Sequence, residues 1–308
     1  PARATSGFFR LMRRRTFTSL SLQQVRIMTT AHSFKRVWLV TGASRGIGAK
    51  IVAAALAHGD AVVATARNAQ TVVERFGELP GLLAVQLDVT NESQAADVAR
   101  AAAEHFGRID VLVNNAGFGV LGAVEEASAD EVRRLYETNV FGLLNVTRGV
   151  LPFMRKARSG HVINISSVGG FRSGAGFGAY CSTKFAVEGL SEALHAELAP
   201  LGVKVTVVEP GYFRTDFLDS NSLVESPRVI DDYAATSGEV RKLAKVYNQQ
   251  QPGNPELLAV AMIKLVEAPN PPMRLALGTD TLQAIEAKLA YVKEETDAWR
   301  ELSASTDF

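Results

Sequence analysis

The 308-residue sequence has almost no cysteine, few aromatic residues and no long apolar run. Cys181 is the only cysteine, which excludes an intrachain disulfide and a cysteine-based metal cluster. A single thiol fits a reducing compartment, and we expect a cytoplasmic protein. No apolar run reaches the roughly 18 residues that a membrane span needs. Lys and Arg (33) nearly balance Asp and Glu (32), so nothing indicates a nucleic-acid-binding protein.

Acidic residues are also missing from the start of the chain, where none precedes Asp60. Residues 1–27 carry six arginines and are rich in Ser and Thr, which is typical of a mitochondrial presequence and of an organelle-targeted protein. We favour a different interpretation, an untranslated leader or vector sequence with Met28 as the native start. The sequence therefore predicts a disordered N-terminal extension over residues 1–35 and one folded domain over residues 36–308.

Short, almost wholly apolar runs alternate with helical patterns from residue 37 onward. Strands are predicted at residues 37–41, 61–65, 82–87, 110–113, 162–165, 203–208 and 273–277. Helices are predicted at residues 47–57, 91–106, 129–156, 179–198, 255–266 and 282–301. This alternation is typical of βαβ units. It predicts a single Rossmann-fold α/β domain whose doubly wound parallel sheet has about seven strands, with helices on both faces.

The alternation breaks at residues 212–253, which are polar and irregular, with some helical stretches within residues 230–246. This insertion follows the sixth predicted strand, at the carboxyl edge of the sheet, where ligands bind in open α/β folds. We therefore predict a lid over a binding site. The alternative is a solvated surface excursion without a function.

A glycine-rich turn joins the first predicted strand to the first helix. Residues 41–48 are Thr-Gly-Ala-Ser-Arg-Gly-Ile-Gly. Glycines allow the backbone to approach a pyrophosphate, and the N-terminus of the helix offers free N–H groups. The alternative is a turn that binds nothing. The predicted phosphate-binding residues are Gly42, Ser44, Arg45, Gly46, Ile47 and Gly48.

The end of the second predicted strand indicates which dinucleotide binds. A carboxylate there would favour NAD, because it accepts hydrogen bonds from the ribose 2′-hydroxyl. The sequence has Arg67 instead, about 20 residues beyond the glycine turn, and Arg45 lies within the turn. Guanidinium groups bind a 2′-phosphate well, so NADP(H) is predicted over NAD(H). Either arginine could alternatively be a solvated surface charge.

A tyrosine and a lysine lie one helical turn apart in the fourth predicted helix. The i, i+4 spacing places Tyr180 and Lys184 on the same helix face. An ammonium group near a phenol lowers the phenol pKa from about 10, which suits proton transfer. Ser167 ends the fifth predicted strand and could donate a hydrogen bond to a carbonyl oxygen. Ser166 is the competitor, but strand alternation turns it to the other side.

These residues resemble the classical short-chain dehydrogenase/reductase family, and the resemblance covers residues 36–278. Its landmarks occur in order: residues 41–48, Asp88-Val89, residues 114–117, Asn139, Ser167, Tyr180/Lys184 and Pro210-Gly211 followed by Thr215. The region 209–215, the insertion and the tail from residue 277 resemble its 17β-hydroxysteroid-dehydrogenase-like branch.

The resemblance implies a role for each catalytic residue. Tyr180 would be the general acid in reduction and the base in oxidation. Lys184 would lower its pKa and hold the nicotinamide ribose, and Ser167 would polarise the carbonyl. Asn139 would hold a water molecule that links Lys184 to solvent.

Cofactor contacts and oligomers are also implied by the resemblance. Asp88 and Val89 would contact adenine, and the nicotinamide carboxamide would bind Thr215 and the backbone after Pro210. Family members often form homodimers or homotetramers. The backbone after Pro210 includes Gly211. Three further residues would line the cofactor groove beside the fourth strand. The three groove residues are Asn115, Ala116 and Gly117.

The sequence thus predicts an NADP(H)-dependent carbonyl reductase or alcohol dehydrogenase that acts on a small-molecule substrate, with no metal ion. Two alternatives remain, a 3-oxoacyl-thioester reductase and a non-catalytic NADP(H)-binding sensor. Aromatic residues near the expected loops could form the substrate pocket or simply pack in the core. They are Phe118, Phe171, Phe177, Tyr212 and Phe213.

Overall fold

The computed structural model describes residues 34–308, which form one compact unit. Nearly all of the predicted extension, residues 1–33, lies outside the described residues. A seven-stranded sheet runs through the unit in the order β3-β2-β1-β4-β6-β7-β9, and all of its pairings are parallel. Its strands are β1 (Val37–Val40), β2 (Ala61–Ala66), β3 (Leu82–Gln86), β4 (Val111–Asn114), β6 (Gly160–Ile165), β7 (Val203–Pro210) and β9 (Arg274–Leu277).

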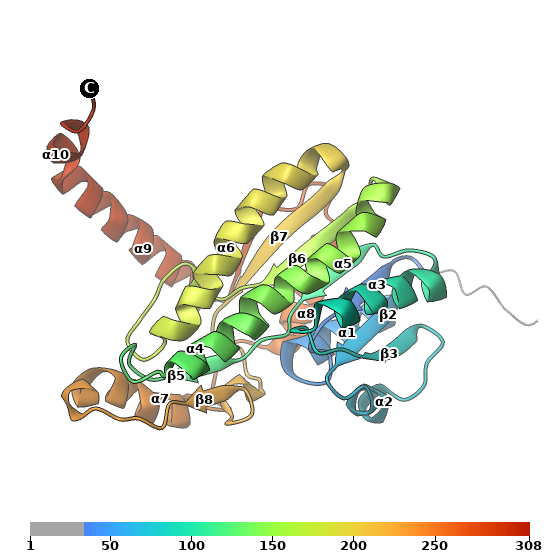
Figure 1. Cartoon of the computed structure of the whole chain (residues 1–308), viewed down its shortest axis with the longest axis horizontal. Helices are drawn as coiled ribbons and strands as arrows, with labels where there is room; N and C mark the ends of the chain where they lie inside the picture. The colour runs from blue at the N-terminus through green and yellow to red at the C-terminus, as the bar shows by residue number, and fades with distance from the viewer. Residues whose placement is uncertain (1–33) are drawn as a thin grey trace, which may run out of the picture. The chain divides into compact units, whose positions relative to one another are not determined.

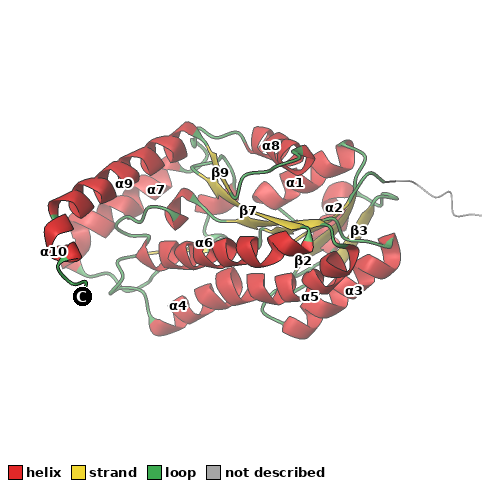
Figure 2. Cartoon of the chain, turned by 90° about the horizontal axis from the view of Figure 1, so that it is seen from above, coloured by secondary structure: helices red, strands yellow, loops and turns green. Residues whose placement is uncertain are grey.

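Helices cover both faces of this sheet (Figures 1 and 2). α1 (Gly46–Ala57) packs against α8 (Pro255–Glu267) on one face. α3 (Glu92–Phe106), α5 (Gly142–Ala157) and α6 (Gly178–Leu198) lie on the other face. The remaining helices are α2 (Gln70–Phe76), α4 (Ala129–Tyr136), α7 (Glu239–Tyr247), α9 (Thr279–Ala298) and α10 (Arg300–Ala304). No helix within residues 34–308 has the length and apolar character that crossing a membrane requires.

The predicted fold class is confirmed, and each of the seven predicted strands is present within a residue or two of its expected bounds. The predicted helix at residues 129–156 is interrupted by a π-helical turn, η1 (Glu137–Phe141), between α4 and α5. Two features were not predicted, namely α2 and a small parallel sheet of β5 (Gly119–Leu121) and β8 (Leu223–Glu225).

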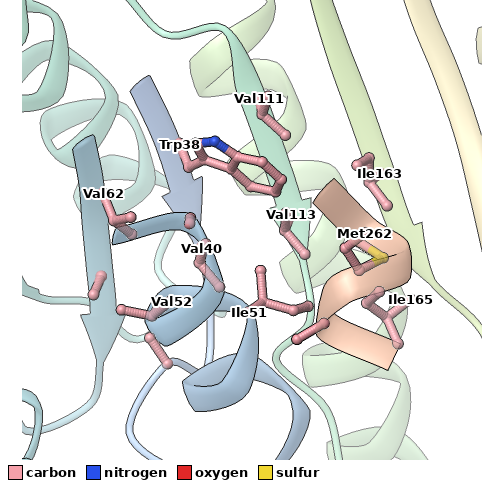
Figure 3. Close-up of a cluster of buried hydrophobic side chains, with 14 of the residues drawn as sticks. Trp38, Val40, Ile51, Val52, Val62, Val111, Val113, Ile163, Ile165 and Met262 are labelled. Atoms are coloured by element: carbon pink, nitrogen blue, oxygen red, sulfur yellow. The ribbon is translucent and has the colours of Figure 1, made fainter. Parts of the chain in front are cut away.

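A dense apolar core fixes the sheet against α1 and α8 (Figure 3). Trp38, Val40 and Val113 project from β1 and β4 onto Ile51 of α1 and Met262 of α8, and all five are fully buried. Burial of a side chain of this size contributes about 1.5–3 kcal/mol. This core therefore provides a firm base for the loops at the carboxyl edge of the sheet.

The direction of winding reverses between β1 and β4, where a binding crevice is expected at the carboxyl ends of the strands. The segment between β7 and α8, which contains β8 and α7, lies beside β5 at this edge (Figure 1). We call residues 211–254 the lid.

Candidate functional site

A cavity of about 1150 Å³ opens at the carboxyl edge of the sheet, between the glycine turn and the lid. Most of the predicted site residues line it, so residues far apart in sequence come together here. They are Gly42, Ser44, Arg45, Gly46, Ile47, Arg67, Asp88, Val89, Asn115, Ala116, Gly117, Phe118, Ser167, Phe177, Tyr180, Lys184, Pro210, Gly211, Tyr212, Phe213 and Thr215. Gly48 and Asn139 lie directly behind this lining, as described below.

The predicted pocket residue Phe171 is placed elsewhere. Its ring lies 5.8 Å from the Arg274 guanidinium and lines a separate, smaller cavity beside α9. The prediction that Phe171 lines the substrate pocket is therefore not supported by its position.

The glycine turn is closed tightly by its neighbours. Gly42 has a φ of 64°, a conformation in which a side chain would be strained. A Cβ atom on Gly48 would lie 2.4 Å from the Gly42 oxygen and 2.5 Å from Asn115 Nδ2. Asn115 Nδ2 donates hydrogen bonds to the oxygens of Thr41 (2.9 Å) and Gly42 (3.1 Å). Asn115 therefore holds the turn in place, a role beyond the predicted one of lining the groove.

The same turn leaves room for an anion on its outer side. Gly46 has a φ of 55°, and the nearest atom to a Cβ placed there is Thr215 Cβ at 3.9 Å. α1 begins at Gly46 without a capping side chain, so its first N–H groups are available to a ligand. A pyrophosphate fits this arrangement, because both the space and the helix dipole favour it.

The two arginines of the predicted NADP site differ in their contacts. Arg67 directly follows β2, is exposed and lines the cavity, and it forms no ion pair within residues 34–308. Arg45 Nη2 instead donates a hydrogen bond of 2.7 Å to the backbone oxygen of Asn221 in the lid. Arg67 is thus free to bind a phosphate, whereas Arg45 connects the glycine turn to the lid.

Ser167, Tyr180 and Lys184 meet at the floor of the cavity. Tyr180 is 8% exposed, and Ser167 lies close enough to act on its pKa; Ser167 Oγ accepts a hydrogen bond from Gly169 N at 3.0 Å. Lys184 Nζ donates to the Ile165 oxygen at 2.8 Å and lies 5.8 Å from the centroid of the Tyr180 ring. Ser166 also borders the cavity, but its Oγ forms no hydrogen bond within residues 34–308 and lies near Glu188 of α6.

Burial controls the protonation of this group. It raises the pKa of Tyr180 above its usual value of about 10, although the nearby Ser167 hydroxyl opposes the shift. It also lowers the pKa of Lys184 to about 8, and the nearby Glu188 carboxylate opposes that shift. The expected lowering of the tyrosine pKa by Lys184 is therefore not seen in this structure, where desolvation is the largest influence and Ser167 is what opposes it. Tyr180 is held as a neutral phenol, which is a proton donor.

Asn139 lies behind this floor, within the π-helical turn η1. Its Nδ2 donates to Phe118 O (2.9 Å) and Thr183 Oγ1 (3.1 Å), and its Oδ1 accepts from Phe118 N (3.1 Å). Both amide protons are therefore used within the protein, and only an Oδ1 lone pair remains for a water molecule. Interruptions of this kind in α-helices occur frequently at functional sites, but periodicity alone did not reveal this one.

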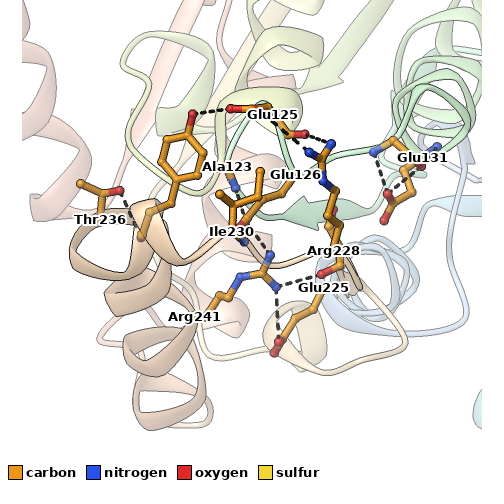
Figure 4. A network of polar contacts seen from close by, with 12 residues as sticks. Ala123, Glu125, Glu126, Glu131, Glu225, Arg228, Ile230, Thr236 and Arg241 are labelled. Carbon is orange, nitrogen blue, oxygen red and sulfur yellow. Dashed lines mark hydrogen bonds and ion pairs between the residues drawn. The ribbon is translucent and has the colours of Figure 1, made fainter.

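A polar network fastens the lid over the cavity (Figure 4). Arg241 on α7 donates to Glu126 Oε2 at 2.8 Å, and Glu126 also accepts from the backbone N–H groups of Ala123 and Ile230. These bonds, chiefly that from Arg241, lower the pKa of Glu126 to about 2. Because Glu126 is 2% exposed, the pair is shielded from water and anchors α7 firmly.

Several cavity residues were missed by the sequence analysis. Phe217 packs 5.5 Å from the Tyr180 ring, and Gln251 lines the cavity from the end of the lid. An aliphatic group on α7 lines the same cavity. The helical pattern around α7 was visible, but nothing in its spacing indicated which face turns inward. The α7 residues are Val240, Leu243 and Ala244.

A sequence profile of the short chain dehydrogenase family matches residues 36–225. Oxidoreductase BOA17 of Botryotinia fuckeliana is 37% identical over 274 residues, covering 88% of this chain and 99% of its own length. The 3-ketodihydrosphingosine reductase of Bacteroides thetaiotaomicron is 40% identical over 245 residues, covering 79% and 88%.

Solved structures agree with this assignment. A short-chain dehydrogenase from Streptomyces avermitilis superposes with a TM-score of 0.82 at 43% identity, covering 90% of this chain and 99% of its own. ElxO with NADP bound has a TM-score of 0.68 at 27% identity, covering 81% and 100%. The 3-ketoacyl-(acyl-carrier-protein) reductase of Brucella melitensis, complexed with NADH, has a TM-score of 0.67 at 26% identity, covering 79% and 97%. The chain belongs to the short chain dehydrogenase family of oxidoreductases.

Proposed function

We propose that this chain is an NADP(H)-dependent oxidoreductase that interconverts a ketone or aldehyde and an alcohol, with Tyr180 as the general acid and base. The observation that carries the proposal is the meeting of Ser167, Tyr180 and Lys184 at the floor of one cavity. A non-catalytic sensor would need only the cofactor groove, so a complete proton-transfer group favours an enzyme.

The chain offers a binding site for each part of the dinucleotide. Gly46 and the first N–H groups of α1 would hold the pyrophosphate, and Asp88 would lie beside the adenosine. Thr215 and the backbone after Pro210 border the same cavity and would hold the carboxamide. When bound, the nicotinamide supplies or accepts the hydride.

The proton steps belong to residues of this chain. Ser167 Oγ would donate a hydrogen bond to the substrate oxygen and polarise the carbonyl. Tyr180 would give its phenolic proton to that oxygen as hydride reaches the carbon, so that C=O becomes CH–OH. The Lys184 ammonium would then stabilise the phenolate that Tyr180 has become. In oxidation the same proton returns to Tyr180.

Arg67 is the basis for proposing NADP(H). Its guanidinium is exposed at the end of β2, next to the place where the adenosine ribose would lie. No carboxylate takes this position, and a 2′-phosphate would supply the missing partner. Arg45 can assist only if it gives up its bond to Asn221.

The substrate we propose is a bulky, largely apolar carbonyl compound. Aromatic and aliphatic side chains from the lid and from the loop before α6 line the cavity, namely Phe177, Phe217, Val240 and Leu243. Similarity to a 3-ketodihydrosphingosine reductase places 3-keto lipids first among substrates to test. A 3-oxoacyl thioester is the alternative, since a solved relative at 26% identity is named for that chemistry. A cytoplasmic location, homo-oligomers and the hydroxysteroid-dehydrogenase-like branch stay predictions.

The test is a spectrophotometric assay of NADPH consumption with 3-keto lipids, steroid ketones, quinones, simple ketones, aldehydes and acetoacetyl thioesters, with NADH in parallel. We expect turnover with a bulky ketone and NADPH, and much slower turnover with NADH. Tyr180→Phe should lower kcat by about 1000-fold or more while NADPH binds as in the wild type, because only the proton donor is lost. Full activity in that variant would refute the mechanism, and equal use of NADH would refute the role of Arg67.

A further inference from the structure

Gln251 is a buried side chain of the cavity whose amide has no partner among the described residues for either of its polar atoms. Gln251 lines the cavity although it is only 1% exposed. Within residues 34–308, neither its Nε2 nor its Oε1 forms a hydrogen bond. An amide buried in this way costs free energy unless something bonds to it. Such a group in a ligand cavity indicates a binding role rather than a packing role.

The backbone around Gln251 is fixed, so the inward direction of the side chain is built into the lid. Gln249 has a φ of 63°, an unusual conformation for a residue with a side chain, and it reverses the chain after α7. Arg214 Nε donates to the Gln251 oxygen at 3.1 Å. Two residues later, Gly253 N donates to the Tyr212 oxygen at 3.0 Å. The segment is thereby held along the chain that follows β7.

Two features of the site favour the substrate over the cofactor as the partner of Gln251. Val240, Leu243 and Ala244, which precede it in the lid, form an apolar wall of the same cavity. The nicotinamide carboxamide already has expected partners in Thr215 and the backbone after Pro210. An uncharged amide also complements an uncharged group better than a carboxylate or an ammonium ion, because it cannot neutralise a charge.

We propose that Gln251 binds an uncharged group of the substrate that both donates and accepts a hydrogen bond, such as a hydroxyl or a carboxamide. This inference rests on the proposed function and narrows its substrate class. The substrate would be an apolar carbonyl compound with one such group near the carbonyl, and Gln251 would select it over the plain ketone.

The test compares matched substrates in Gln251→Met, which keeps the length of the side chain but removes its hydrogen bonds. Long-chain ketones are paired with hydroxyketones of the same length that carry the hydroxyl at successive positions. We expect the wild type to prefer at least one hydroxyketone. In Gln251→Met, kcat/KM for that compound should fall about tenfold while the plain ketone changes less than about twofold. Gln250→Met, at the exposed neighbouring residue, is the control and should change neither.

Calorimetric titration of the same compounds in the presence of NADP⁺ keeps this test independent of turnover. A wild type that binds hydroxyketones but does not reduce them would refute the proposed function and leave the role of Gln251 standing. Three results would overturn the role: no preference for any hydroxyketone, an equal loss on both members of a pair, or weaker NADPH binding as the main effect of Gln251→Met. The Tm of Gln251→Met should not decrease, because the amide has no partner in the protein to lose.

Discussion

The glycine turn and the lid face each other across one cavity, yet they are held in different ways. The turn is fixed by side-chain hydrogen bonds to its own backbone from the end of the adjacent strand β4, such as those from Asn115 to the oxygens of Thr41 and Gly42. The lid is fixed by side chains that meet across about a hundred residues of sequence, chiefly Arg241 and Glu126. The bonds that hold the glycine turn suit a cofactor phosphate, which is the same in every reaction cycle. The side-chain contacts that hold the lid can differ between enzymes that bind different substrates.

Arg45 connects the two regions through its bond to Asn221. A cofactor phosphate that attracts Arg45 would compete with this contact, because one guanidinium would serve both partners. We therefore expect cofactor binding at the turn and substrate binding at the lid to respond separately to substitutions, except through the contact between Arg45 and Asn221. Substitutions in the turn and in the lid can show whether each affects only one of the two binding steps.

Among the substitutions that compare the glycine turn with the lid, the largest effect is expected in the turn. In Gly48→Ala the new methyl group would overlap the Gly42 oxygen, so the turn must move. We expect kcat/KM for NADPH to fall about 100-fold, since displacements of this size disturb a preorganised site severely. Fluorescence titration with NADPH would show whether binding is the step affected. Gly189→Ala, where nothing lies within 4 Å of the new atom, is the matched control and should behave as wild type. A normal NADPH affinity in Gly48→Ala would contradict the view that the turn is rigid.

The next effect concerns the lid. Arg241→Met leaves the buried carboxylate of Glu126 without its cation, which is strongly unfavourable. We expect KM for the carbonyl substrate to rise about tenfold as α7 loosens, while NADPH binding changes little. Steady-state kinetics with each substrate varied in turn would separate these effects. Lys242→Met, which removes only an exposed ion pair on the same helix, should have almost no effect. An equal loss of NADPH affinity in Arg241→Met would show that the two regions are coupled.

The same contrast explains what the sequence could predict. The glycine turn, Ser167 and the Tyr180/Lys184 pair lie at strand ends or on one helix face, so strand order and helical spacing place them together. Gln251 and Arg241 belong to a segment whose path depends on pairings such as β5 with β8, which no local pattern encodes. The raised pKa of Tyr180 was also beyond the sequence, because desolvation depends on packing by residues such as Phe217.

The smallest expected effect is on stability in acid, where the central sheet and the lid should respond differently. His161 on β6 is 4% exposed, and burial, assisted by the charge of Lys204, lowers its pKa to about 4. The unfolded chain protonates this histidine near its ordinary pKa of about 6.5, so it binds a proton that the folded state refuses. Stability contributed by the neutral imidazole is therefore complete above about pH 6.5 and is lost as the pH falls toward 4. Glu126, with a pKa of about 2, keeps the lid anchored throughout that range.

His161→Gln should remove this acid sensitivity. Glu188 complicates the wild type, because burial raises its pKa to about 7 and its uptake of a proton stabilises the folded state as the pH falls. The difference between variant and wild type cancels that contribution. We expect the variant to gain about 1 kcal/mol of relative stability between pH 7 and pH 5.5, measured by urea unfolding. If the difference in unfolding free energy between variant and wild type is the same at both pH values, His161 takes up its proton in the folded sheet as readily as in the unfolded chain. The sheet and the lid anchor would then no longer differ in their response to acid over this range.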